Sequence, residues 1–272
     1  MKSVRKALTI AGSDSGAGAG IQADLKTFAA LGVYGTSAIT AITAQNTLGV
    51  TRVLALNPDL VAAQIDAIIA DIGAHALKTG MLANAAIIDI VAQKIRQHQL
   101  KNLVVDPVMV ATSGDLLIKK NAVATLRSQL LPLATVVTPN LPEAEQLTGK
   151  PLRAWKDIEA AARHITAMGA RAVIIKGGHR HGPAVDLLFD GKKMLALSAP
   201  RIRTRNTHGT GCTFSAAIAA GLAKGESLER AARSAKKYIT TAIRAGFKVG
   251  AGHSPVNHFY RFWKISDCRP RG

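Results

Sequence analysis

Short runs of apolar, often β-branched residues alternate along the chain with longer segments that carry apolar residues at helical spacing. The runs predicted to be strands are residues 7–11, 36–42, 52–56, 76–79, 103–106, 136–138 and 172–176. The segments predicted to be helices are residues 21–31, 58–72, 85–98, 122–130, a helix from Pro142, and residues 155–168, 210–224 and 228–245. Strands that alternate with helices predict an α/β fold in which helices cover both faces of a mostly parallel sheet.

Two segments near the C-terminal end depart from this alternation. Residues 185–189 and 193–197 are apolar runs on either side of Asp190-Gly191, a pair typical of a hairpin turn, so we expect an antiparallel edge there. Residues 260–272 are rich in Arg, Lys and Pro. We therefore expect one domain over residues 1–259, followed by a loosely attached basic tail over residues 260–272.

The composition is that of a globular protein, with 48% apolar and 19% charged residues. Cys212 and Cys268 lie far apart and form no metal-binding spacing, which favours a reducing compartment. No apolar run approaches the roughly 18 residues of a membrane span, and the N-terminal apolar stretch is too short for a signal peptide. We expect a cytoplasmic protein without a membrane partner.

The formal net charge of +18 raises the possibility of a nucleic-acid partner. Aromatic residues make up only 4% of the chain and are not interleaved with the basic ones, as single-strand binding requires. No zinc-finger or helix-turn-helix signature is visible. We therefore expect no nucleic-acid partner. We attribute the positive charge to a generally basic proteome and to an anionic substrate.

Residues 206–213 read N-T-H-G-T-G-C-T and lead into an Ala-rich helix. Gly209 and Gly211 flank Thr210, which allows successive backbone N–H groups to point at one anion beside the positive end of the helix dipole. Cys212 lies in the first helical turn, where the dipole lowers a thiol pKa, and is a candidate general base. A buried structural cysteine beside a helix N-cap is the alternative.

Residues 11–20 read A-G-S-D-S-G-A-G-A-G between the first strand and the first helix. A dinucleotide-binding loop requires an acid about 20 residues further on, but no Asp or Glu lies between Asp24 and Asp59. A Walker A loop requires Gly-Lys-Ser or Gly-Lys-Thr, and neither occurs. The remaining interpretation is a loop that brings backbone close to a ligand, with Asp14 and Asp24 as polar groups.

Further polar residues follow predicted strands, where ligands bind in open α/β sheets. Asp106 is either a Mg²⁺ ligand or a cap, and Asn140 with Glu143 either binds Mg²⁺–phosphate or caps a helix. Lys176 precedes two glycines and either meets a phosphate or stays solvated. Gln45 offers an amide that suits the edge of a flat heteroaromatic ring.

These motifs, in this order, resemble the ribokinase-like superfamily and, within it, the bacterial hydroxymethylpyrimidine and phosphomethylpyrimidine kinases of thiamine biosynthesis. The resemblance spans about residues 7–259 and is carried by A-G-S-D-S-G-A-G-A-G-I-Q-A-D, A-Q-N, K-T-G-M-L, D-P-V-M-V-A-T-S-G-D, T-P-N-L-P-E-A, I-K-G-G-H and N-T-H-G-T-G-C-T. It implies ATP, Mg²⁺ and two phosphorylations, first of 4-amino-5-hydroxymethyl-2-methylpyrimidine and then of its monophosphate. It also implies a homodimer.

The resemblance further implies roles for individual residues. Cys212 matches the catalytic base, and Gly209, Thr210 and Gly211 match the anion hole. Residues that match the substrate pocket are Gly12, Asp24, Gln45, Met81 and Val108. Residues that match the metal and nucleotide sites are Asp106 and Glu143 for Mg²⁺, and Lys176, Asn140 and Thr207 for ATP.

Three alternatives stay open at this point. A pyridoxal or pyridoxine kinase of the same superfamily acts on a similar hydroxymethylated ring. Some of these kinases carry a second cysteine after D-P-V-M, whereas this chain has Val110-Ala111-Thr112, which favours the pyrimidine as the substrate. A catalytically silent ligand sensor would have lost the base or the anion hole, and this chain keeps both. A nucleic-acid binder would show affinity that falls steeply with salt.

Overall fold

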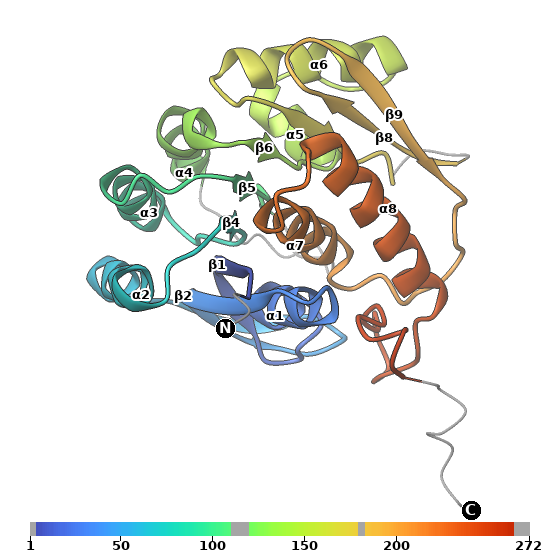
Figure 1. Cartoon of the computed structure of the whole chain (residues 1–272). Helices are drawn as coiled ribbons and strands as arrows, with labels where there is room; N and C mark the ends of the chain where they lie inside the picture. Colours follow the sequence, from blue (N-terminus) through green and yellow to red (C-terminus); the bar gives the residue numbers. More distant parts are fainter. Residues whose placement is uncertain (1–3, 110–119, 179–182, 264–272) are drawn as a thin grey trace, which may run out of the picture.

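The computed structural model describes residues 4–109, 120–178 and 183–263. Within them, nine strands form one sheet in the order β3-β2-β1-β4-β5-β6-β7-β8-β9 (Figure 1). The strands are β1 (Lys6–Asp14), β2 (Tyr34–Gln45), β3 (Val50–Ala55), β4 (Ala76–Thr79), β5 (Leu103–Val105), β6 (Val136–Val137), β7 (Val173–Ile175), β8 (Ala184–Phe189) and β9 (Met194–Ala199). Pairing is parallel from β2 through β1, β4, β5 and β6 to β7. The prediction of an α/β fold with a mostly parallel sheet is confirmed.

Both edges of this sheet are antiparallel. The predicted hairpin forms β8 and β9, and β8 also runs antiparallel to β7. Asp190 closes the turn by accepting hydrogen bonds from the backbone N–H groups of Lys192 and Lys193, and Gly191 has a φ of 89°. At the opposite edge, β3 runs antiparallel to β2, an orientation that the apolar pattern did not predict.

Helices cover both faces of the sheet (Figure 1). They are α1 (Gly20–Ala30), α2 (Pro58–Asp71), α3 (Ala85–Gln97), α4 (Lys120–Thr125), α5 (Leu141–Thr148), α6 (Trp155–Ala167), α7 (Thr210–Ala223) and α8 (Leu228–Arg244). Consecutive side chains of β5 show why both faces need cover. Leu103 and Val105 pack with the cluster under α2, α3, α5 and α6, whereas Val104 packs with the cluster under α1, α7 and α8.

The helix boundaries follow from side-chain caps and from proline. Asn57 and Asn84 cap α2 and α3 through hydrogen bonds from the backbone N–H groups of Asp59 and Ile87. The helix predicted over residues 122–130 is not uniform. Its second half, Leu126–Leu130, is a π-helical segment, because Pro132 has no N–H to continue the regular α-helical ladder.

The C-terminal segment begins in contact with the body of the fold. The ring of Tyr260 lies 5.6 Å from that of Tyr238 in α8, so the first residues of the predicted tail are packed, while residues 264–272 lie outside the described part. Among the described residues, no helix is long and apolar enough to cross a membrane. Val110-Ala111-Thr112, which distinguished the pyrimidine from vitamin B6 above, also lies outside the described residues.

Candidate active site

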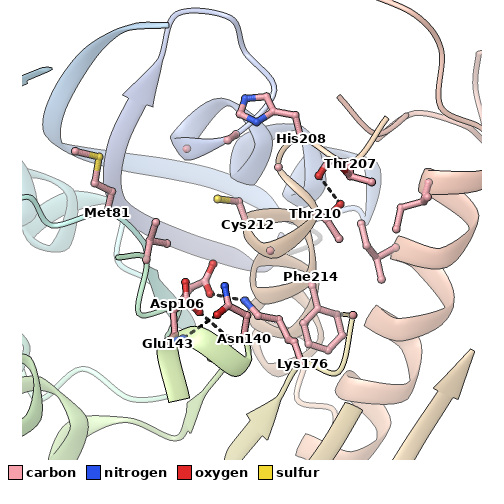
Figure 2. A pocket seen from close by; sticks show the side chains of 18 of the residues that line it. Met81, Asp106, Asn140, Glu143, Lys176, Thr207, His208, Thr210, Cys212 and Phe214 are labelled. Carbon is pink, nitrogen blue, oxygen red and sulfur yellow. Dashed lines mark hydrogen bonds and ion pairs between the residues drawn. The ribbon is translucent and has the colours of Figure 1, made fainter. Parts of the chain in front are cut away.

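A cavity of about 650 Å³ lies at the carboxyl ends of the strands and at the N-terminus of α7, where open α/β sheets bind ligands. Its lining includes every predicted site residue except Asp24: Gly12, Gln45, Met81, Asp106, Val108, Asn140, Glu143, Lys176, Thr207, Gly209, Thr210, Gly211 and Cys212. Figure 2 shows the labelled members of this lining converging from different elements, with Met81 on one side, Cys212 at the start of α7, and Lys176 with Asp106 below it.

The predicted anion hole is a tight turn that leads into α7. Gly209 is the N-cap and has a φ of 76°, a conformation that favours glycine. Thr210 donates its hydroxyl to the carbonyl of Thr207 at 2.7 Å, which holds the turn. No side chain caps the helix start, and the backbone N–H of Thr210 donates to the carbonyl of Thr207 at 3.2 Å. The N–H groups that an anion can meet are therefore those of Gly209 and Gly211, which line the cavity on either side of Thr210.

The Cys212 side chain is half-buried and lines the cavity from the first turn of α7. Burial raises the pKa of Cys212 to about 11; Lys78 opposes this shift, whereas Asp24 and Asp106 add to it. The prediction that the helix terminus would lower the thiol pKa is therefore wrong, because burial outweighs the dipole. A thiol with this pKa is a strong base only in its minor, deprotonated form.

Asp24 is not among the residues that line the cavity, and its assignment to the substrate pocket stays a prediction. Its side chain is fully buried and forms an ion pair with Lys78, also fully buried, at 2.9 Å, together with a hydrogen bond from Thr9 at 2.6 Å. Burial raises the pKa of Asp24, and Lys78 opposes this shift. Lys78, which sequence reasoning did not assign, is the member of this pair that reaches the cavity.

Asp106, Glu143 and Lys176 form a second charged group. Lys176 contacts Asp106 at 3.0 Å, and Thr138 and Ser215 also hydrogen-bond the Asp106 carboxylate. Burial would raise the pKa of Asp106, but Lys176 and Lys78 hold it below its ordinary value.

Asn140 and Glu143 form the capping box of α5, so the helix-cap interpretation of both residues is confirmed. Burial raises the pKa of Glu143 to about 7, partly opposed by Lys176 and reinforced by Asp106. A buried carboxylate with a raised pKa beside a second carboxylate is a site that a divalent cation would stabilise. The described residues hold no group of three or more His, Cys, Asp or Glu side chains with metal geometry. Two oxygen ligands nonetheless fit Mg²⁺, which takes its other ligands from water and phosphate.

The glycine-rich loop is organised by Asp14, a residue for which the sequence suggested only a polar role. Its carboxylate accepts hydrogen bonds from the backbone N–H groups of Gly16, Gly18 and Ala19 at 2.8, 3.1 and 2.8 Å. It also contacts Nε2 of His208 at 2.8 Å. Burial alone would raise the pKa of Asp14, but the hydrogen bonds from His208 and the loop hold it below the ordinary value. Sequence reasoning missed His208, although it stands inside the N-T-H-G-T-G-C-T motif.

The opposite wall of the cavity carries Gln45 and Met81. Gly12 donates its backbone N–H to the carbonyl of Met81 at 3.1 Å, and a methyl group at Gly12 would lie 3.2 Å from the Met81 sulfur. The glycine therefore keeps room for the thioether at the cavity surface. Gln45 is anchored by Ser15, whose hydroxyl accepts from its backbone N–H and donates to its carbonyl.

A further part of the cavity is lined by residues that no motif indicated. Lys236 in α8 pairs with Asp186 in β8 at 2.7 Å, and the other Asp186 oxygen accepts the backbone N–H of Gly177 at 3.0 Å. Apolar residues Ile202 and Ile243 lie on the same lining. Ile243 lies in α8 and Ile202 in the segment between β9 and α7, and no sequence motif marks either residue as part of a site.

Comparisons with known proteins agree with this geometry. The family model described as phosphomethylpyrimidine kinase matches residues 14–257. The hydroxymethylpyrimidine/phosphomethylpyrimidine kinase of Rhizobium meliloti (strain 1021) is 56% identical over 263 residues, 95% of this chain and 98% of that protein. Among solved structures, an ADP complex of Bacillus subtilis pyridoxal kinase matches with a TM-score of 0.88 and 46% identity, over 94% of this chain and 98% of the other.

A second solved structure, the phosphomethylpyrimidine kinase of Clostridium difficile 630, has a TM-score of 0.79 and 44% identity over 89% of this chain and all of that one. The fold is thus shared with a pyridoxal kinase, but the family model and the Rhizobium relative favour a pyrimidine kinase over a pyridoxal kinase. The sensor and nucleic-acid alternatives have no support among these matches. The chain belongs to the hydroxymethylpyrimidine/phosphomethylpyrimidine kinase family of thiamine biosynthesis.

Proposed function

We propose that this one cavity performs both phosphorylations of the pyrimidine, with the roles of its residues divided between two walls. The observation that carries the proposal is the meeting, at the start of α7, of a glycine turn without a side-chain cap and a thiol that lines the same cavity as Gln45. The turn suits the transferred phosphoryl group, the thiol suits the reacting hydroxyl, and the amide suits the ring.

In the first step, the hydroxymethyl oxygen attacks the γ-phosphorus of ATP, and the bond from that phosphorus to the β,γ-bridging oxygen breaks. The hydroxyl proton passes to the Cys212 thiolate, and ADP leaves. The backbone N–H groups of Gly209 and Gly211 stabilise the charge on the transferred group, since phosphoryl transfer depends mainly on positioning and electrostatics.

In the second step, an oxygen of the monophosphate attacks a second ATP. That oxygen is already anionic near pH 7, because the second phosphate pKa is about 6. No proton has to leave it, so Cys212 is not required as a base. The demand falls on cationic groups that offset repulsion between two phosphates, and Lys176 at the cavity wall is placed for this role.

Asp106 and Glu143 are proposed to hold Mg²⁺, which supplies charge neutralisation to the phosphates when bound. Asn140 orients Glu143 through the capping box, and Thr207 fixes Thr210 in the anion-hole turn. Lys176, Asn140 and Thr207 therefore form the proposed nucleotide side of the cavity. The ADP complex of the B. subtilis protein supports ATP as the phosphate donor.

We further propose a homodimer through the β2–β3 edge. All but the first residue of β3 are exposed, and large apolar side chains gather on and beside this edge: Tyr34, Ile42, Leu48, Val53, Leu54 and Leu60. Exposed apolar patches of this kind mark interaction surfaces. A cytoplasmic location suits a reaction that consumes ATP and requires a free thiol.

A coupled assay of ADP release with the pyrimidine alcohol, its monophosphate and pyridoxal tests the proposal. We expect turnover of the alcohol and the monophosphate, each stopped by removal of Mg²⁺ with a chelator. Turnover of pyridoxal alone would contradict the proposal.

A further inference from the structure

The Cys212 sulfur lies where two loops meet. Gly20, the last residue of the glycine-rich loop, donates its backbone N–H to the sulfur. The anion-hole loop, residues 206–211, precedes Cys212 and packs directly against the glycine-rich loop, since a methyl group at Gly209 would lie 1.8 Å from the carbonyl oxygen of Gly18. Both loops therefore set the position of the sulfur.

Gly20 is also the first residue of α1, so the sulfur lies at the N-terminus of a second helix besides its own. The N-cap of α1 is Ala19, whose methyl side chain cannot accept a hydrogen bond from the helix. The sulfur of Cys212 takes the place of that missing acceptor. The N–H of Gly20 and the positive end of the α1 dipole both favour a negative charge on the sulfur.

A fully buried ammonium lies on the same side of the sheet as α1 and α7. Lys78 pairs in register with Val104 of β5, whose side chain packs under α1, α7 and α8, so the Lys78 side chain faces these helices. An added Cβ at Gly80 would lie 2.7 Å from Lys78 Nζ, so the ammonium reaches the carboxyl end of β4. Helix α7 packs against β4, and the charge of Lys78 opposes the raised pKa of Cys212.

Asp24 in α1 holds this ammonium through the ion pair at 2.9 Å. The ammonium and the hydroxyl of Thr9 both contact Oδ2, whereas Oδ1 has no hydrogen-bond partner among the residues that the structure describes. A fully buried ion pair generally adds little net stability, because desolvation offsets the attraction. Stability alone therefore gives no reason for this pair, whereas its place beside Cys212 does.

Four charged groups from four elements act on the thiol: Lys78 in β4, Lys176 after β7, Asp24 in α1 and Asp106 after β5. The two lysines favour the thiolate, and the two carboxylates oppose it. The other ionisable side chains of the cavity lining are Asp14, Glu143, Asp186, Arg201, His208 and Lys236. Asp106 and Lys176 belong to the proposed metal and nucleotide sites, so Asp24 and Lys78 are the pair that can be changed without altering those sites.

We propose that Lys78 is a positioning residue for the Cys212 base. Its buried ammonium, together with the N–H of Gly20, stabilises the thiolate that accepts the hydroxyl proton, and Asp24 holds the ammonium in place while limiting its effect. The inference rests on the proposed function and deepens it, because it names the residues that set the strength of the base.

The thiolate is measured without any substrate, by the rate at which iodoacetamide alkylates Cys212 between about pH 7 and 9. All proteins carry Cys268→Ser, since Cys268 is the other cysteine of the chain. One variant is Asp24→Asn, which removes the charge that opposes the thiolate. The second combines Asp24→Asn with Lys78→Met, which removes both charges at similar volume. The matched control combines Asp66→Asn with Lys94→Met, which removes the ion pair at 2.6 Å between α2 and α3.

A shift of one pKa unit changes the thiolate fraction tenfold and the alkylation rate about threefold, because a less basic thiolate is a weaker nucleophile. We expect Asp24→Asn to be alkylated about threefold faster than the parent protein and the variant that lacks both charges about threefold more slowly, with the control unchanged. A loosened fold would expose the thiol and speed alkylation in both variants, so it cannot explain opposite shifts. Either variant decides alone if the other does not fold. A rate for Asp24→Asn at or below the parent rate would overturn the inference, as would a rate for the double variant at or above it.

The kcat/KM for the pyrimidine alcohol distinguishes this inference from the proposed function. It should rise in Asp24→Asn and fall in the variant that lacks both charges, because the first step depends on the thiolate. The kcat/KM for the monophosphate should change less in both variants. If alkylation shows the expected order but turnover of the alcohol does not follow it, the stabilised thiolate stands and the proposed function of Cys212 as a base fails.

Discussion

Gly209→Ala tests whether the close packing of the two loops creates the anion hole. Gly209 has a φ of 76°, and an added Cβ would lie 1.8 Å from the Gly18 carbonyl oxygen and 2.8 Å from its carbon. The first of these is about 1.6 Å short of the 3.4 Å at which ordinary contact begins, and both neighbours are backbone atoms. The glycine-rich loop and the anion-hole loop would therefore have to separate.

The chain offers a matched control in Gly225, which follows α7. Its φ is 82°, and an added Cβ would meet no atom within 4 Å. Alanine at either position has to adopt a left-handed backbone conformation, which costs roughly 1–2 kcal/mol. Only the variant at Gly209 also displaces the loops, and a displacement of about 1 Å at a catalytic group lowers rates by roughly 10²-fold.

Thermal unfolding and kcat/KM with both pyrimidine substrates distinguish the two effects. Gly225→Ala should lower stability modestly and leave kcat/KM within about twofold. Gly209→Ala should lower kcat/KM by about 10² or more on the alcohol and on the monophosphate alike, because the anion hole serves both steps. A folded Gly209→Ala protein with nearly normal turnover would refute this reasoning.

Two further predictions concern the ring wall and the acid stability of the fold. Gln45→Leu should raise the KM for the pyrimidine by about tenfold or more and leave that for ATP nearly unchanged, because it leaves polar ring atoms unpaired; equal increases would contradict ring recognition by Gln45. Burial lowers the pKa of His258, whose Nε2 contacts Thr213 at 3.0 Å, from 6.5 to about 3. Its contribution to stability is thus complete above about pH 6.5 and declines as pH falls toward 3, by up to about 1.4 kcal/mol per pH unit, since the unfolded chain binds the proton first. Urea unfolding at several pH values should show this decline in the wild type and a shallower one in His258→Gln; identical slopes would show that His258 is not responsible.

The local elements of this fold were predictable because their signals are local. The strand predicted over residues 76–79 matches β4, and the helices predicted to start at Pro58 and Ala85 start there. Asn57 and Asn84 precede these helices and carry the caps. The direction of β3 was not predictable, since an exposed edge strand has the same residue pattern in either direction.

The site was predictable in its parts but not in their contacts. Cys212 and the glycines of its motif could be assigned from their place before a helix. The partnership of Asp14 with His208 could not, because it depends on two loops meeting through Gly18 and Gly209. The raised pKa of Cys212 was missed for a similar reason, since burial is a property of the folded chain and the helix dipole can be inferred from the sequence alone.

Cys212→Ala tests most directly whether Cys212 serves as a base in the first step only, while the anion hole serves both steps. The measurement is kcat/KM for the alcohol and for the monophosphate in wild type and variant between pH 6 and 9. We predict a loss of roughly 10²–10⁴-fold on the alcohol and less than about tenfold on the monophosphate, because only the alcohol must lose a proton. In the wild type, kcat/KM for the alcohol should rise with pH across this range, since the pKa of Cys212 is about 11, whereas kcat/KM for the monophosphate should be nearly flat above about pH 7. Equal losses on both substrates, or an alcohol rate that does not depend on pH, would contradict the account and show that Cys212 shapes the anion hole instead.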